Sequence, residues 1–309
     1  MSENLPQKKI KDEGSFQLIP ESTPTKRYFK SIKNSHPSIT TQTLSSQLLQ
    51  KRGTIFRKLA KRTQKANLHF EQTLRITSLY RINESFKGFN RLQSIDFMFF
   101  DDIQVTDKAL DHLRRCLRRL KLLKNVSLRF TLPETLTDNG LKILSKGLKS
   151  CFLLQGISLS FSGCSKITNL GLSHISKSLK RLTSLRKVRL NFSSCSKITD
   201  KGLLALATNL KGLKGLKGLN LNFCHCDMIT DKGLEVLCEI VEKLACLQEV
   251  CFEFESCTKL TLKGEEKINE SFRKHPSFQR YHEKFCFRWG WKIVGRCTGK
   301  VKFFPIRPK

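Results

Sequence analysis

Leu185–Leu203 reads LRKVRLNFSSCSKITDKGL, and Leu216–Leu234 reads LKGLNLNFCHCDMITDKGL. In the first stretch the apolar residues Val188, Leu190 and Phe192 alternate with polar ones, which is the period-two pattern of a half-buried strand. After a short polar turn, leucines recur at the three- and four-residue spacing of a helix. Each stretch therefore predicts a strand, a turn and the start of a helix.

The same pattern returns every 31 residues along most of the chain. One column of this repeat is threonine, at Thr106, Thr137, Thr168, Thr199, Thr230 and Thr261. An aromatic column runs through Phe99, Phe130, Phe161, Phe192, Phe223 and Phe254, with Phe285 expected as its seventh member. A third column holds Cys164, Cys195, Cys226 and Cys257. A unit that cannot bury its apolar side alone buries it against the next copy, so the repeat predicts a stacked solenoid.

Each repeat threonine falls where a helix begins, and its hydroxyl can accept a free backbone N–H there. An aspartate follows the threonine in most units and places a negative charge near the positive end of the helix. Glycine recurs three residues after the threonine, although it lowers helix propensity by about 1 kcal/mol relative to alanine. We interpret these glycines as positions where neighbouring backbone comes too close for a side chain.

These residues resemble the leucine-rich repeat, in the ribonuclease-inhibitor-like and cysteine-containing variety of F-box/leucine-rich-repeat proteins. The matching pattern is L-x-x-[VL]-x-L-x-F-x-x-C-x-x-I-T-D-x-G-L, and it covers about Leu92 to Phe278. The unit is longer than the usual repeat, and the sixth unit departs from the pattern at Leu262 and Glu265. The resemblance implies an α/β fold: a curved right-handed solenoid of about six 31-residue strand–helix units with degenerate caps, a parallel sheet on the concave side and helices on the convex side.

The chain divides into four segments on this basis. Residues 1–50 are polar and aperiodic, and we expect them to form a disordered basic segment. Residues 51–91 are predicted to form a basic helix and a degenerate first repeat, residues 92–277 the solenoid, and residues 278–309 a C-terminal cap with a basic-aromatic tail. For Cys286–Lys309, a capping hairpin and a free tail are alternatives.

The chain carries 57 Lys and Arg against 26 Asp and Glu, a formal net charge of +31. Its sequence shows neither the apolar run that a membrane-spanning helix needs nor the pattern of a secretory signal. We therefore expect an intracellular protein, cytoplasmic or nuclear, with reduced cysteines. The basic cluster at residues 51–62 predicts a nuclear-localisation signal, a basic amphipathic helix at a surface or, as we favour, a first helix that covers the end of the solenoid.

Part of the charge forms columns within the repeat. The basic residues at two helical positions are Arg115, Arg118, Lys146, Lys149, Lys177, Lys180 and Lys211. Because neighbouring helices pack about 8–10 Å apart, these residues predict a continuous positive stripe near the helix C-termini. The stripe either gives solubility and complements the helix dipoles, or it docks an acidic partner such as nucleic acid, an acidic protein tail or anionic lipid.

Strand residues that point away from the core should line the concave face, where such solenoids bind partners. We predict partner-binding residues at Arg129, Arg189, Asn191, Asn220, Asn222 and Glu253. The small, polar and mixed-charge residues of this face suit the recognition of a protein better than that of a phosphate backbone. The alternative is a solvated strand face without a dedicated partner.

Signatures of catalysis are missing: the sequence has no phosphate-binding loop, no nucleophile elbow and no H-E-x-x-H motif. Cys224–Cys226 is a dense Cys/His cluster, but no second cysteine pair follows at zinc-site spacing. We therefore expect neither metal nor cofactor, and we interpret the cysteine column as structural, with Cys224 on the open strand face and Cys226 in the column. Thr23, which precedes a proline, is a candidate phosphorylation site.

Together these features predict a non-enzymatic scaffold that binds a protein partner through the concave face and the flanking basic segments. By resemblance, one alternative is a substrate-receptor subunit of an SCF-type ubiquitin ligase, although residues 1–65 show no Leu-Pro-led helix of an F-box. Another alternative is a basic subunit that docks on nucleic acid or on an acidic cytoskeletal surface.

Overall fold

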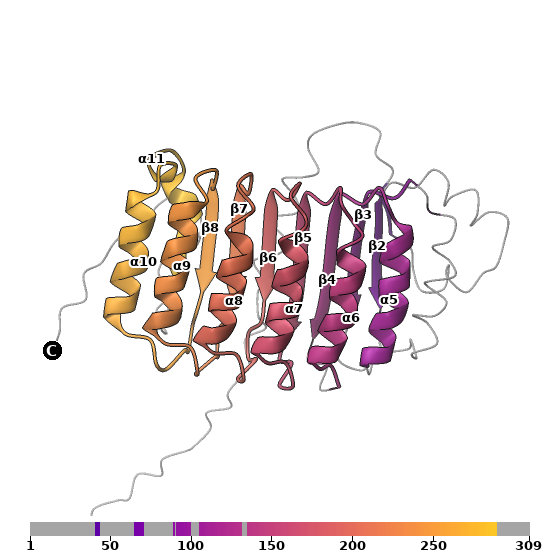
Figure 1. The fold of residues 1–309 in the computed structure, drawn as a ribbon, viewed down its shortest axis with the longest axis horizontal. Helices are drawn as coiled ribbons and strands as arrows, with labels where there is room; N and C mark the ends of the chain where they lie inside the picture. Colours follow the sequence, from indigo (N-terminus) through magenta and orange to yellow (C-terminus); the bar gives the residue numbers. More distant parts are fainter. Residues whose placement is uncertain are drawn as a thin grey trace, which may run out of the picture. The chain divides into compact units, whose positions relative to one another are not determined.

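The computed structural model describes residues 41–43, 65–70, 89, 91–99, 105–131 and 135–288. All of them belong to the unit that spans Thr40–Lys309. Their strands form one nine-stranded parallel sheet, whose strand order follows the chain (Figure 1). The strands are β1 (Thr41–Thr43), β2 (Lys65–Phe70), β3 (Ser94–Phe99), β4 (Asn125–Thr131), β5 (Gly156–Ser162), β6 (Lys187–Asn191), β7 (Gly218–Asn222), β8 (Glu249–Glu253) and β9 (Phe285–Arg288).

Helices connect the strands from β3 onward and lie side by side against one face of the sheet (Figure 1). They are α5 (Asp107–Arg119), α6 (Asp138–Leu148), α7 (Asn169–Leu179), α8 (Asp200–Leu210), α9 (Asp231–Lys243), α10 (Leu262–Lys274) and the short α11 (Phe278–Tyr281). One strand and one helix alternate in each unit, which confirms the predicted α/β solenoid with a parallel sheet. None of the described helices is both long enough and apolar enough to span a bilayer.

A ladder of phenylalanine rings runs through the core near the ends of the strands. All six rings predicted from Phe99 to Phe254 are buried. The ring centroids are 4.9 Å apart for Phe99 and Phe130, and 5.9 Å apart for Phe192 and Phe223. Such ring pairs contribute about 0.5–1.5 kcal/mol each beyond the burial of their surface. The aromatic column is therefore confirmed as one of the contacts that join one unit to the next.

The seventh ring of the ladder is not Phe285, as the period predicted. β9 pairs with β8 so that Phe285 lies opposite Val250, and the ring of Phe287 contacts that of Phe254 at a centroid distance of 6.0 Å. The last connection exceeds the period because α11 and a 3-10 turn at His282–Lys284 precede β9. The described residues after α11 thus continue the parallel sheet, and the hairpin and free-tail alternatives for Cys286–Lys309 lie mostly outside the described residues.

The helix N-termini confirm the capping role of the threonine column and correct the interpretation of the glycines. In five of its six members, the hydroxyl accepts a backbone N–H of the first helical turn, and Thr261 is the exception. A Cβ placed on Gly171 would lie 2.4 Å from Asp138 Oδ1 of the preceding unit. The glycine is needed because a neighbouring carboxylate occupies that space, and not because of neighbouring backbone.

Two strands extend the sheet ahead of the regular units. β2 pairs in register with β3, so that Leu68 lies opposite Phe97, at the position predicted for the degenerate first repeat. β1 falls within residues 1–50, which were expected to be disordered. Thr41–Thr43 departs from that expectation because it pairs with β2. The sheet therefore begins earlier in the chain than the repeat pattern indicates.

Three predictions fall outside the described residues. They concern the phosphorylation site at Thr23, the basic cluster at 51–62 and, of the predicted cap and basic-aromatic tail at 278–309, the part after Arg288. All three stay predictions.

Candidate functional site on the open face of the sheet

The open face is the side of the sheet turned away from the helices, and alternate strand residues line it in register. One row holds Asp96, Ser127, Ser158, Arg189, Asn220, Cys251 and Cys286. The next row holds Met98, Arg129, Ser160, Asn191, Asn222, Glu253 and Arg288. Neighbouring strands lie about 4.8 Å apart, so each row is a continuous surface. All six residues predicted to bind a partner lie in these rows and are half-buried.

An ion pair joins strands β3 and β4 on the open face. Arg129 Nη2 lies 2.9 Å from Asp96 Oδ2 and 3.2 Å from its Oδ1. The two side chains are 25% and 16% exposed, so water screens the pair only in part. Asp96 thus fixes the direction of the guanidinium on the open face.

The centre of the open face is a floor of small side chains. Ser158 and Ser160 are half-buried, and Ser127 beside them is buried. Arg129 and Arg189 flank this floor on the neighbouring strands β4 and β6. Serine side chains extend less far from the sheet than the flanking arginines, and their hydroxyl groups can donate and accept hydrogen bonds. The centre can therefore receive side chains of another protein between two arginines.

Lys187 and Glu249 form an ion pair across the intervening strand β7, with Nζ 3.5 Å from Oε2. Gly218 occupies the position between them, and a Cβ there would lie 3.4 Å from Lys187 Cγ and 3.6 Å from Glu249 Oε2. Arg189 also reaches Glu249, at 3.7 Å. The hollow over Gly218, which Asn220 also lines, is too shallow to enclose an organic ligand.

Sequence reasoning missed Lys187, Gly218 and Glu249 as parts of this face. Each lies two residues before a member of the first row, so the period-two alternation already placed them on the same side. What the alternation could not show was that a missing side chain on one strand lets charges on its two neighbours meet.

The side chains of Asn191 and Asn222, at the ends of β6 and β7, already form hydrogen bonds within the protein. Oδ1 of Asn191 and of Asn222 each accept the backbone N–H two residues further on, at 2.8 Å and 3.1 Å. These bonds stabilise turns that each contain a residue with a φ of 58°. Asn222 Nδ2 also donates to Glu253, which faces Arg288 at 3.7 Å. Asparagine, carboxylate and guanidinium thus form a polar chain at the β9 end of the open face.

The cysteine column is structural, as predicted. The thiols of Cys195, Cys226 and Cys257 each donate to the carbonyl of the ladder phenylalanine in the preceding unit, at 3.2–3.3 Å. Burial raises the pKa of the Cys257 thiol to about 11, so it keeps its proton at neutral pH. Cys224 lies in the turn beyond the end of β7 and is buried, so its thiol is not exposed on the open strand face as predicted. Among the described residues, no three His, Cys, Asp or Glu side chains gather as they would around a metal ion.

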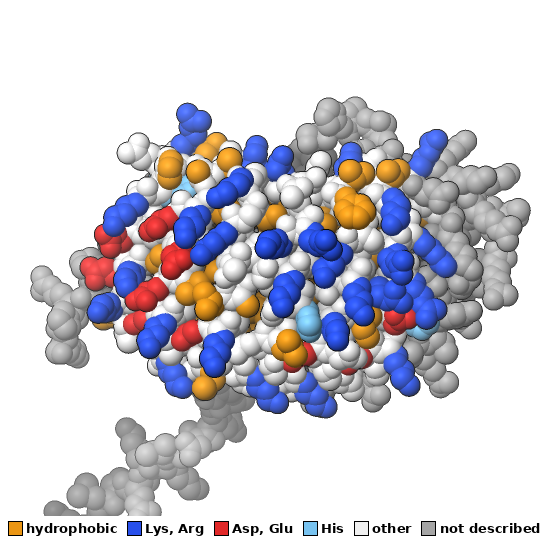
Figure 2. Space-filling model, in the orientation of Figure 1, with side chains coloured by type: hydrophobic (Ala, Val, Ile, Leu, Met, Phe, Trp, Pro, Cys, Tyr) orange, Lys and Arg blue, Asp and Glu red, His pale blue; other side chains and the backbone are white. Residues whose placement is uncertain are grey.

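The basic stripe follows the C-terminal ends of the helices. Lys and Arg side chains are spread over α5 to α8, whereas acidic side chains gather over α9 and α10 (Figure 2). Arg115 pairs with Asp111, at 2.8 Å, and this contact helps to lower the pKa of that carboxyl group, after the larger effect of Arg114. The stripe residues without an ion pair to another described residue are Arg118, Lys146, Lys149, Lys177 and Lys180.

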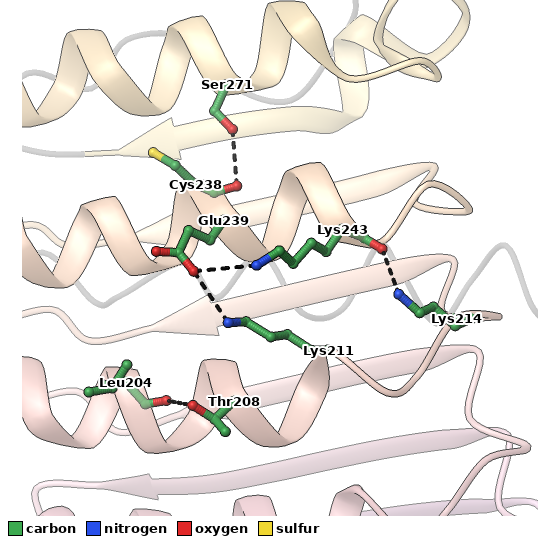
Figure 3. A network of polar contacts seen from close by, with 8 residues as sticks. All are labelled: Leu204, Thr208, Lys211, Lys214, Cys238, Glu239, Lys243 and Ser271. Atoms are coloured by element: carbon green, nitrogen blue, oxygen red, sulfur yellow. Dashed lines mark hydrogen bonds and ion pairs between the residues drawn. The ribbon is translucent and has the colours of Figure 1, made fainter.

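The stripe ends in a network with α9. Lys211 Nζ lies 3.3 Å from Glu239 Oε2, and Lys243 Nζ lies 3.7 Å from the same oxygen (Figure 3). Lys214 Nζ contacts the Lys243 carbonyl at 3.5 Å. Partly exposed pairs of this kind contribute about 0–1 kcal/mol. Lys211 is therefore engaged within the protein, unlike the stripe residues on α6 and α7.

The leucine-rich-repeat family matches residues 184–207 of the chain. No curated protein matches the chain at a significant level. Among solved structures, actin-binding site 2 of leiomodin-1 is similar at a TM-score of 0.41 and 16% identity, over 55% of this chain and 89% of that one. A chain of the yeast Rad7–Elc1 complex is similar at 0.38 and 15%, over 72% and 70%. The Caenorhabditis elegans tropomodulin C-terminal domain is similar at 0.35 and 10%, over 62% and 87%.

Proposed function

We propose that this leucine-rich-repeat protein is a non-enzymatic scaffold that binds a protein partner across the open face of its sheet. The observation that carries the proposal is the polar, mixed-charge character of that face over strands β3 to β9. Its hollow over Gly218 is too shallow for an organic ligand, whereas a protein surface needs no cavity.

The charges of the open face indicate how a partner would be oriented. Arg129 and its carboxylate Asp96 lie on β4 and β3, and Glu253 and Arg288 lie on β8 and β9. Between them, Lys187 and Arg189 share Glu249. Such an arrangement of both signs favours one register of a partner over others, because a shifted partner places like charges together.

The serine floor offers the sharpest test of this proposal. Ser160→Trp places a large ring in the middle of the open face, and Thr208→Trp places the same ring on the exposed surface of α8 as a matched control. Proteins captured from native cells by each tagged variant are quantified by mass spectrometry against the wild type. We expect Ser160→Trp to bind its specific partner with an affinity at least tenfold lower than wild type (about 1.4 kcal/mol). The control should capture the partner as wild type does.

Equal capture by wild type, Ser160→Trp and Thr208→Trp would contradict recognition on the open face. Capture of a cullin-type adaptor that survives Ser160→Trp would instead favour the substrate-receptor alternative, in which another segment binds the adaptor. The stripe lysines at the ends of α6 and α7 form no ion pair with another described residue, and they favour a second candidate, docking on an acidic surface.

A further inference from the structure

Two neighbouring corners between helix and strand carry exposed apolar side chains. Leu122 follows α5 and is 42% exposed, and Phe152 and Leu153 follow α6 and are 64% and 46% exposed. The equivalent positions after α7, α8 and α9 hold Thr183, Ser184, Lys214, Gly215, Ala245 and Cys246. We call Leu122, Phe152 and Leu153 the apolar corner. Among the described connections that lead from a helix to the next strand, only these two carry exposed leucine or phenylalanine side chains.

The two connections are in direct contact. Both Gln155 N and Gly156 N donate to the Lys124 carbonyl, at 2.7 Å and 2.9 Å. Leu122 and Leu153 stand at the same place in their units, three residues before paired positions of β4 and β5. With neighbouring strands about 4.8 Å apart, the apolar corner is one continuous patch.

Basic residues surround the apolar corner on the same edge of the molecule. They are Arg118, Lys121, Lys124, Lys149, Lys180 and Arg181. From Asn139 to Thr199 the chain has eleven Lys and Arg and no Asp or Glu. Figure 2 shows hydrophobic side chains exposed at the upper ends of α5 and α6 with Lys and Arg side chains beside them. A positive field of this extent attracts polyanionic surfaces.

Helix-dipole complementarity explains the basic residues in the last helical turns but not the exposed apolar ones. Nucleic acid also fits the charge, but base recognition by stacking needs aromatic rings, and two of the three apolar side chains are leucines. Phe and Leu beside Lys and Arg are the combination that binds the interface of an anionic bilayer, where apolar groups reach the acyl boundary and cations meet the headgroups.

We propose that this edge docks the protein on an anionic lipid bilayer. Phe152, Leu122 and Leu153 enter the headgroup–acyl boundary, and Lys121 and Lys149 contact the headgroups beside them. The contact is peripheral and reversible, since three side chains insert and none of the described helices crosses the membrane. The open face points away from the helix layer and stays accessible to a protein partner.

The full chain is tested by co-sedimentation with phosphatidylcholine vesicles, with and without phosphatidylserine. We expect binding only to vesicles with phosphatidylserine, and weaker binding as salt is raised. Phe152→Ser with Leu153→Ser keeps the charge and lowers the partition coefficient by about tenfold or more. Lys149→Gln keeps the apolar corner and lowers it by about fivefold. Leu204→Ser, at a leucine of α8 that is 52% exposed, is the matched control and leaves binding unchanged.

Binding that is equal with and without phosphatidylserine, absent from both vesicles, or unchanged in the Phe152/Leu153 double variant would overturn the proposal. So would tight binding of single-stranded RNA that displaces the vesicles and survives the double variant, because it would assign the edge to nucleic acid. Circular dichroism of each variant checks that the substitutions, at three exposed residues and the half-buried Lys149, leave the fold intact. Loss of vesicle binding with intact partner capture separates this inference from the proposed function of the open face.

Discussion

Asp138 on α6 holds the first turn of the next helix through Thr168. Its Oδ2 accepts the Thr168 hydroxyl at 2.6 Å, and its Oδ1 accepts the backbone N–H groups of Thr168 and Gly171 at 2.8 Å and 2.9 Å. Donors that a helix N-terminus leaves unpaired are thus satisfied by the preceding unit. The same contact recurs in neighbouring units, with Asn169 in place of the aspartate at Thr199.

Replacing Asp138 with alanine should destabilise the protein, because it leaves donors of Thr168 and Gly171 without an acceptor. The expected loss is about 1–3 kcal/mol in the free energy of unfolding, measured by urea denaturation. Asp138→Asn should cost less, because Asn169 makes the equivalent contact in the next unit. Equal stability of Asp138→Ala and wild type would show that water replaces the carboxylate.

Gly171→Ala should also destabilise the protein, although alanine is the better helix former by about 1 kcal/mol. Its Cβ would lie 2.4 Å from Asp138 Oδ1, and the carboxylate would have to leave its partners. Gly212→Ala is the control, because no atom lies within 4 Å of the added Cβ. We expect a lower thermal midpoint for the first variant only, and a rise in both would refute the packing argument.

Phe192→Ala removes one ring from the middle of the ladder, between Phe161 and Phe223. The expected cost is about 3–5 kcal/mol, since a buried aromatic site cannot collapse against rings fixed on both sides. Phe152→Ala, at an exposed phenylalanine, should change stability by less than about 0.5 kcal/mol. Denaturation curves of the two variants with equal midpoints would mean that the ladder contributes nothing.

Acid should destabilise the chain through His275. The ring is buried, its Nδ1 accepts the Ser277 backbone N–H at 3.2 Å, and its Nε2 lies 3.2 Å from the Leu244 carbonyl, so the neutral tautomer fits. Burial lowers the pKa of His275 in the folded state. The unfolded chain, with a histidine pKa of about 6.5, therefore binds protons first as the pH falls.

The contribution of His275 should thus leave the thermal midpoint unchanged between about pH 6.5 and pH 8 and lower it below that range. His275→Asn should show a shallower decrease between neutral and mildly acidic pH. A residual slope is expected from His174, whose pKa is lowered by burial and next by Lys142. Identical slopes for wild type and His275→Asn would exclude His275 as the group that titrates.

Oxidised glutathione should convert Cys251 and Cys286 into a disulfide with each other. Their thiols lie opposite each other on β8 and β9, with sulfur atoms 2.7 Å apart. One thiolate attacks glutathione disulfide and releases one glutathione, and the second thiol then displaces the other with loss of its proton. Mass spectrometry of peptides should find the two cysteines cross-linked, whereas Cys286→Ser should retain a mixed disulfide at Cys251. Mixed disulfides alone in the wild type would contradict this geometry.

The 31-residue period was sufficient to identify the core and the order of the elements. The position of Phe192 holds an apolar residue in every unit. Stacked units share one core, so side chains at that position must be buried there. Alternation along each strand likewise placed Arg129 and Arg189 on the open face. Position within a unit is local information, so a single sequence contains it.

Contacts between units required the three-dimensional structure. The period did not show that the Asp138 carboxylate fills the space at Gly171 or that Lys187 meets Glu249 over Gly218. Nor did it show that a longer last connection places Phe287 opposite Phe252, with its ring against that of Phe254. The repeat pattern predicts the position of a residue within its own unit, but not which atoms of the next unit its side chain contacts. Those contacts depend on the distances between packed units, which are defined only when the units are stacked.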